Sequence, residues 1–168
     1  LTYSPFAILF TAFASCGVSQ SINLIDGMNG LASGIILLIS IGLSIISFSV
    51  GEKDLGFFSL IISISTMGFL IWNFPKGLIF LGDSGNYLIS TMTALIILKE
   101  NFYNPENYYI EEIFLLLLIP GIDMFRLFIT RIIKKQNPFK RDNDHLHYLL
   151  YYKFGYHKTI LLYLFLKI

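Results

Sequence analysis

The stretch LASGIILLISIGLSIISFSV, residues 31–50, decides the fold, because no residue in it carries a charge. A helix of about 20 residues is about 30 Å long, which is the thickness of the hydrocarbon core of a bilayer. Within lipid a continuous segment satisfies its backbone hydrogen bonds as a helix, so this stretch is predicted to cross a membrane. Four similar stretches, and a sixth beginning near Thr159, are predicted as well: 5–22, 55–74, 87–98 with some extension, and 113–133.

The sequence therefore predicts an all-α, polytopic integral membrane bundle with five full spans and a truncated sixth. Hydrophobic residues make up 55% of the chain, charged residues only 14%, and the mean hydropathy is +0.68, which excludes an ordinary soluble domain. No repeat or linker divides residues 1–168, so a single transmembrane domain is expected. The net charge of +1 offers no basic surface, and no nucleic-acid partner is predicted. Cys16 is the single cysteine, which excludes an internal disulfide.

Three short polar runs interrupt the apolar chain, at residues 23–30, 80–85 and 142–147. Ionisable groups beside hydrocarbon are costly and are usually kept for a function. If the first span ends inside, alternate crossings bring all three runs to the inner face. Most of the Lys and Arg residues lie in the inner segments, whereas the outer loops hold only Lys53 and Lys99. This asymmetry predicts that the shared face is cytoplasmic.

Asp83 lies between Gly82 and Gly85 at the expected start of a helix. One interpretation is that this acid acts as a cap for the helix N-terminus and has no further function. The flanking glycines favour a second interpretation, since they let a phosphate or a hydrated ion approach the backbone. A hard cation such as Mg²⁺ binds one or two carboxylates together with substrate phosphates.

Asn23, Asp26 and Asn29 recur every third residue and have Gly27 and Gly30 between them. Asp-Gly and Asn-Gly pairs are also common in turns without any further function. At a membrane boundary, however, three hydrogen-bonding side chains without a local Lys or Arg suit recognition of a polar ligand.

His145 and His147 follow Arg141 in a basic inner segment. A zinc site is not favoured, because no cysteine and no third histidine lies close by in the sequence. Contact with phosphate, with a change of charge near neutral pH, is the preferred interpretation, and a solvated loop without a role is the alternative. Asp123 and Arg126 share a helix face, where an ion pair and a supporting role in the site are equally favoured.

Together the three runs resemble the polyprenyl-phosphate N-acetylhexosamine-1-phosphate transferases of glycosyltransferase family 4, of the MraY and WecA types. Residues 23–32 are similar to that family's Asn-Leu-x-Asp-Gly-x-x-Gly-Leu-Ala signature. Residues 80–85 are similar to its Phe-x-Gly-Asp-x-Gly, and residues 142–147 to its Asp-x-x-His-x-His. Order and spacing agree across nearly the whole chain.

The resemblance implies transfer of a sugar 1-phosphate from a UDP-N-acetylhexosamine to undecaprenyl phosphate, with release of UMP and a requirement for Mg²⁺. It implies a multi-pass enzyme of the bacterial inner (plasma) membrane with a cytoplasmic active site. A homodimer is left open as a further partnership.

The resemblance also gives roles to single residues. Asp83, Asp26 and His145 would be catalytic, and Asp83 and Asn23 would hold the metal. Phe80 would stack on uracil. The remaining substrate-binding positions would be Asn23, Gly27, Asn29, His147 and Arg141.

Three positions depart from the family pattern. Asn29 stands where many members have Asp, Asn86 follows Gly85 where Ser is usual, and Tyr148 takes a position often held by His. The family's aspartate-rich motif is absent, so the chain would be roughly the C-terminal half of a full member, and the activity of this half alone is left open. A membrane transporter and a non-catalytic scaffold of the same fold are the alternatives.

The predicted sidedness can be tested by labelling. Single cysteines introduced as Asn143→Cys and Asn104→Cys, each in a Cys16→Ser background, should react from opposite sides of intact cells. We expect a membrane-impermeant thiol reagent to label position 104 only, because the inner segments carry the excess of Lys and Arg. Labelling of both positions from outside would exclude a shared cytoplasmic face.

Overall fold

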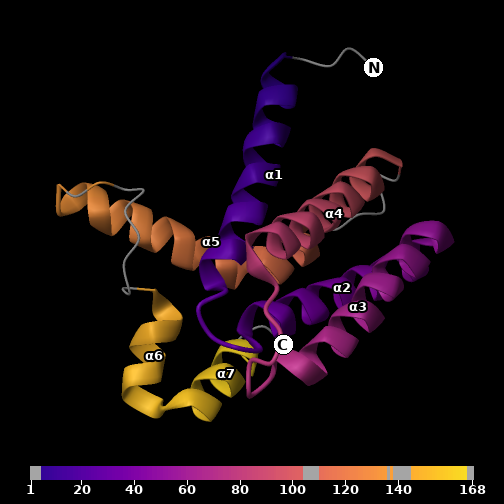
Figure 1. The fold of residues 1–168 in the computed structure, drawn as a ribbon. Coiled ribbons are helices and arrows are strands. Elements are labelled where there is room, and N and C mark those ends of the chain that lie inside the picture. Colours follow the sequence, from indigo (N-terminus) through magenta and orange to yellow (C-terminus); the bar gives the residue numbers. More distant parts are fainter. Residues whose placement is uncertain (1–4, 104–109, 136, 138–144, 166–168) are drawn as a thin grey trace.

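The computed structural model describes residues 5–103, 110–135, 137 and 145–165, and the described part of the chain contains helices, turns and loops but no strand (Figure 1). The predicted all-α class is therefore confirmed for these residues. The helices, in chain order, are α1 (Pro5–Ile25), α2 (Leu31–Val50), α3 (Lys53–Asn73), α4 (Gly82–Tyr103), α5 (Ile110–Ile133), α6 (Leu146–Phe154) and α7 (Tyr156–Phe165).

Two helices near the site extend beyond the apolar stretches of the sequence or lie between them. Helix α4 begins at Gly82, which confirms the expected helix start at the Gly82–Gly85 turn and places Asp83 in the first turn, and it ends at Tyr103, beyond the apolar stretch 87–98. The apolar pattern underestimates this helix because its first residues are the polar ones of the second run. Helix α6 is not among the predicted spans, since its nine residues are too few to cross a bilayer, and it begins at Leu146, two residues before the helix start expected at Tyr148.

Helix α2 forms the centre of the bundle and contacts α1, α3, α4, α5 and α7. Leu31, Ile35, Ile39 and Leu43 follow one another at intervals of four residues and are at most 1% exposed. This spacing places them on one face of the helix, where they form the middle of the hydrophobic core.

Helices α2 and α3 lie side by side as a hairpin (Figure 1). Ser63 Oγ donates a hydrogen bond to Ser40 Oγ over 2.9 Å, and Ser44 Oγ donates to the Gly56 carbonyl over 3.0 Å. Small residues let two helix backbones approach closely, and buried hydroxyl bonds add to the contact where lipid supplies no hydrophobic drive. Ser40 and Ser44, which interrupt the apolar sequence of α2, thus belong to a helix interface.

The distribution of polar and apolar side chains is that of a membrane protein. Large apolar residues such as Phe13, Ile64 and Ile71 are more than 60% exposed, whereas Thr66 and Asn73 are buried. Helices α2 and α3 are long and apolar enough to cross a bilayer, with mean hydropathies of 2.4 and 1.9. These observations support the membrane bundle, and the number of spans stays a prediction.

The connections α1–α2 and α3–α4 meet the start of α7 at one end of the bundle (Figure 1). The Asn73 side chain joins the two connections: its Oδ1 accepts from Gly30 N–H over 2.6 Å, and its Nδ2 donates to the Ile79 carbonyl over 2.8 Å. The Tyr156 hydroxyl donates to the Asn29 carbonyl over 2.7 Å. Gly30 starts α2 with a φ of +83°, a backbone conformation that glycine adopts without strain.

Candidate active site

Two pairs of an acid and an amide connect the end of α1 with the start of α4. Asn23 Nδ2 donates to Asp83 Oδ1 over 3.1 Å, and Asn86 Nδ2 donates to Asp26 Oδ2 over 2.6 Å. In each pair one partner comes from the first polar run and the other from α4, 60 residues later. The first and second polar runs therefore form one polar centre, as the sequence predicted.

Asp26 and Asp83 are close enough to influence each other electrostatically. Desolvation by the surrounding protein raises the pKa of Asp26, and the nearby charge of Asp83 raises it further, while the bond from Asn86 acts in the opposite direction. No Lys or Arg of the described residues forms a salt bridge with either carboxylate. Two neighbouring carboxylates without a basic partner are a donor set that could hold a cation.

Phe80 and Asn29 lie in the two connections beside this centre. Phe80 is 73% exposed, so its ring is free to stack on a flat ligand. Asn29 Nδ2 donates to the Pro75 carbonyl over 3.3 Å, and this contact links the two connections. The structure thus gives Asn29 a role in loop packing, and its predicted contact with substrate stays a prediction.

Gly27 brings the third polar run against the first. A Cβ atom at this position would overlap Nε2 of His147 and would lie 2.8 Å from the hydroxyl oxygen of Tyr148. Because Gly27 follows Asp26 directly, the start of α6 lies next to the acid–amide pairs. All three polar runs therefore meet at one site, although Arg141 falls outside the described residues.

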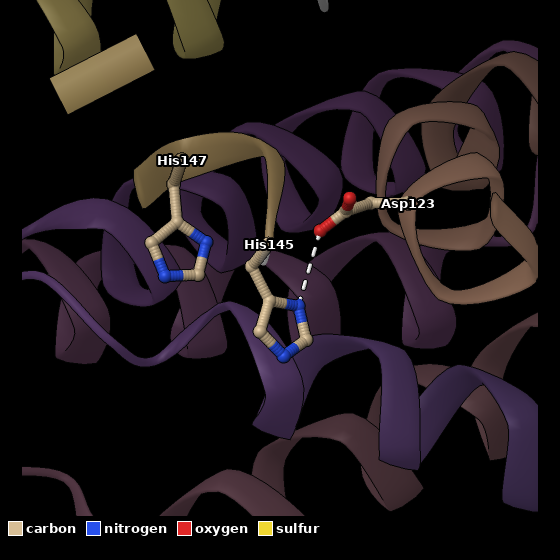
Figure 2. Close-up of side chains that lie close together, drawn as sticks. All are labelled: Asp123, His145 and His147. Carbon is tan, nitrogen blue, oxygen red and sulfur yellow. Dashed lines mark hydrogen bonds and ion pairs between the residues drawn. The ribbon is translucent and has the colours of Figure 1, made fainter. Parts of the chain in front are cut away.

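The two histidines differ sharply in their surroundings. Figure 2 shows both rings extending from the start of α6, with only that of His145 connected to Asp123. The rings stack with centroids 5.4 Å apart, and the ring of His147 also packs 4.3 Å from that of Tyr148. His147 is fully buried, and neither of its nitrogens has a hydrogen-bond partner among the described residues.

This burial corrects one sequence-based expectation. His147 was expected to change its charge near neutral pH. Desolvation by burial, with a smaller effect of neighbouring His145, instead lowers its pKa to about 4. His147 is therefore neutral at pH 7 and packs against Gly27 as an uncharged ring.

Asp123 completes the histidine cluster from α5. Its Oδ2 lies 3.3 Å from His145 Nδ1, and its Oδ1 lies 3.0 Å from Arg126 Nη2. One ligand atom each of Asp123, His145 and His147 lies within 4.8 Å of the others, a spacing that could also hold a metal ion. The sequence argument against zinc did not include this carboxylate, because Asp123 lies 22 residues before His145 in the chain.

Asn86 and Asp123 are the residues of the site that the sequence interpretation underestimated. Asn86 is fully buried and pairs with Asp26, but in the sequence it is noticeable only as a departure from the family pattern. The Asp123–Arg126 ion pair was anticipated as one of two interpretations, and the structure contains both the ion pair and a contact with the site. An acid within an apolar span was the available signal.

Comparison with known proteins identifies the family of this chain. A family model described as "Glycosyl transferase family 4" matches residues 1–101. The chain belongs to glycosyl transferase family 4. It spans less than half the length of the curated family 4 relatives described next.

Three family 4 relatives illustrate the range of similarity. The chain is 33% identical to an undecaprenyl-phosphate alpha-N-acetylglucosaminyl 1-phosphate transferase of Thermotoga maritima, over 87% of this chain and 44% of the relative. It is 30% identical to a decaprenyl-phosphate N-acetylglucosaminephosphotransferase of Mycobacterium leprae, over 95% of this chain and 45% of the relative. It is 32% identical to a phospho-N-acetylmuramoyl-pentapeptide-transferase of Staphylococcus carnosus, over 56% of this chain and 29% of the relative.

The contact at Gly27 predicts the effect of adding one methyl group. Gly27→Ala should lower the free energy of unfolding by about 1–3 kcal/mol, because the buried ring of His147 has no space to move into. Thermal unfolding in detergent measures this loss. Gly68→Ala is the matched control, since its Cβ would meet no atom within 4 Å. Equal stability of the two variants would contradict the contact.

The neutral state of His147 predicts a dependence of stability on pH. Its pKa is about 4 in the folded protein against 6.5 as a model value, so unfolding takes up a proton between these limits. The stabilising contribution is complete above about pH 6.5 and is lost as the pH falls towards 4. Thermal midpoints measured between about pH 7 and 4.5 should fall more steeply for the wild type than for His147→Asn. Parallel curves would contradict the burial of a neutral ring.

Proposed function

We propose that the full-length protein transfers a sugar 1-phosphate from a UDP-N-acetylhexosamine to undecaprenyl phosphate, releases UMP and requires Mg²⁺. The reaction would take place at the cytoplasmic face of the bacterial plasma membrane. In this transfer an oxygen of the lipid phosphate attacks the phosphorus that carries the sugar. The bond from this phosphorus to the oxygen of UMP breaks, and UMP leaves with the electron pair.

The observation that carries the proposal is the pair of acid–amide contacts between the end of α1 and the start of α4. Asp83 and Asn23 are the residues that would hold Mg²⁺, with Asp26 beside them. The donor set is suitable, since hard divalent cations prefer carboxylate and amide oxygens. When bound, Mg²⁺ supplies charge neutralisation for the pyrophosphate of the donor.

The surrounding residues would bind and orient the two substrates. The exposed ring of Phe80 offers a stacking surface for uracil. His145 would contact a phosphate group, and Arg141 would add a positive charge that suits phosphate. Neutral His147 would shape the site by packing against Gly27.

The names of the relatives support the class of reaction. Those from Thermotoga maritima and Mycobacterium leprae are named as transferases of N-acetylglucosamine phosphate to a polyprenyl phosphate, and they align with most of this chain. The muramoyl-pentapeptide transferase aligns with 56% of it. We therefore propose that the donor is a UDP-N-acetylhexosamine. We also propose that the lipid product serves the synthesis of an envelope polymer other than peptidoglycan.

The alternatives from the sequence differ in what they require. A transporter needs a polar site at the middle of the membrane, whereas the polar runs of this chain gather at one end of the bundle. A non-catalytic scaffold of the same fold would keep the geometry without release of UMP. An assay of UMP release by the full-length protein, with Mg²⁺, undecaprenyl phosphate and several UDP-N-acetylhexosamines, separates these possibilities. Absence of release with every donor would overturn the proposed function.

Asp83→Asn tests the proposed metal-binding acid. We expect this change to lower turnover by about 100-fold or more, because the loss of a charge that neutralises a phosphoryl-transfer site affects the transition state directly. Membrane insertion should not change. UMP release at saturating and at limiting Mg²⁺ measures the effect.

Asp54→Asn is the matched control, because Asp54 also lies in the first turn of a helix, α3. It shares the interaction of an acid with a helix N-terminus but lies on the side predicted to be external. Turnover should stay close to that of the wild type. Similar losses of turnover in the two variants would show that Asp83 acts only as a helix cap.

A further inference from the structure

Asp123 is a buried acid within α5 that the proposed reaction does not yet use. Its side chain is only 2% exposed. Burying a carboxylate is costly unless hydrogen bonds and opposite charge compensate for the lost water. The partners of Asp123 therefore show what the surrounding structure is built to hold.

Asp123 accepts hydrogen bonds at both oxygens. Oδ1 accepts from Arg126, with distances of 3.0 Å to Nη2 and 3.3 Å to Nε, and from the backbone N–H of Leu146 over 3.0 Å. Oδ2 lies 3.3 Å from His145 Nδ1 (Figure 2). Arg126 supplies the opposite charge, and the two other contacts both reach the start of α6.

The contact with Leu146 fixes the backbone of the third polar run. Leu146 is the first residue of α6, and the preceding His145 gives no side-chain cap to that helix. The first N–H groups of a helix have no partner within the helix and need one from elsewhere. Asp123 supplies the cap for α6 from α5, and it thereby anchors the residue that follows His145.

The contact with His145 fixes the state of the ring. An ionised carboxylate only accepts hydrogen bonds, so the proton must lie on Nδ1 of the imidazole. The hydrogen bond that the described residues make to the side chain of His145 is at Nδ1. His147, two positions later, has no comparable partner on either nitrogen. Only one of the two histidines is therefore held in a defined tautomer.

We propose that Asp123 is a positioning residue that holds the proton on Nδ1 of His145 and presents Nε2 to a substrate phosphate. The inference rests on the proposed function for the identity of that substrate. With Nδ1 protonated, Nε2 is the nitrogen that takes up a proton from a phosphate or a water molecule and then donates it in a hydrogen bond to a phosphate oxygen. Asp123 itself does not touch the substrate.

The first test is spectroscopic and does not depend on activity. The ¹H–¹⁵N spectrum of the imidazoles in the full-length protein, assigned by comparison with His145→Ala, reports which nitrogen carries the proton. We expect Nδ1–H for neutral His145 in the wild type and in Asp123→Glu. In Asp123→Asn the amide can donate to Nδ1, so the proton should move to Nε2. An Nε2–H tautomer in the wild type overturns the proposal even if Asp123→Asn does not fold.

The second test is kinetic and uses a double-mutant cycle. Asp123→Asn should lower kcat by about 10- to 100-fold, as does loss of other groups that orient a functional histidine, with little change in the KM for the UDP-sugar. Asp123→Glu should restore much of this loss. In a His145→Ala background, Asp123→Asn should have almost no further effect. An equal loss in both backgrounds would show that Asp123 acts through helix packing instead.

Added zinc tests the competing explanation, a metal site made of Asp123, His145 and His147. One equivalent of zinc should leave the Nδ1–H signal of wild-type His145 in place. Loss of this signal with zinc, and its return with a chelator, would overturn the proposal in favour of the metal site. Since the spectra need no substrate, an inactive protein with the expected tautomer would refute the proposed function but not the positioning of His145.

Discussion

The contact between Gly27 and His147 is the constraint on which the site depends. Without a side chain at position 27, the start of α6 can lie against the turn that follows α1. That contact brings a cluster of histidines and a cluster of acids into one site, although Gly27 and His147 lie 120 residues apart in the sequence. An additional methyl group at position 27 would force the fully buried ring of His147 to shift.

The two clusters differ in their exposure to water and in the groups that compensate their charges. The acids at the ends of α1 and α4 keep their charges near one another and near water, with amides as their protein partners. The histidine cluster is enclosed, and its one carboxylate is compensated by Arg126, His145 and the N–H of Leu146. The proposed phosphoryl transfer would use both properties, with charge neutralised at the acids and a hydrogen bond directed to phosphate at the histidines.

Much of this arrangement could be predicted from the sequence, and the limits have physical causes. The apolar stretch at 31–50 gave α2 with its bounds, and counting the crossings brought the polar runs to one end. The pairing of Asn86 with Asp26 could not be predicted, because a contact across 60 residues depends on how α1 and α4 pack. The burial of His147 was missed for the same reason, since nothing adjacent to it in the sequence indicates Gly27 as its neighbour.

The turn between α1 and α2 is held mainly through its backbone. Asn73 accepts from the N–H of Gly30, and Tyr156 donates to the carbonyl of Asn29. The shape of the turn thus depends on residues of α3 and α7, and not on Asn23 and Asp26, which are proposed to face the ligand. Substitutions at Asn23 or Asp26 would then change the proposed ligand contacts while the turn keeps its form. Related proteins can therefore evolve different ligand contacts at these positions while the backbone of the turn stays the same.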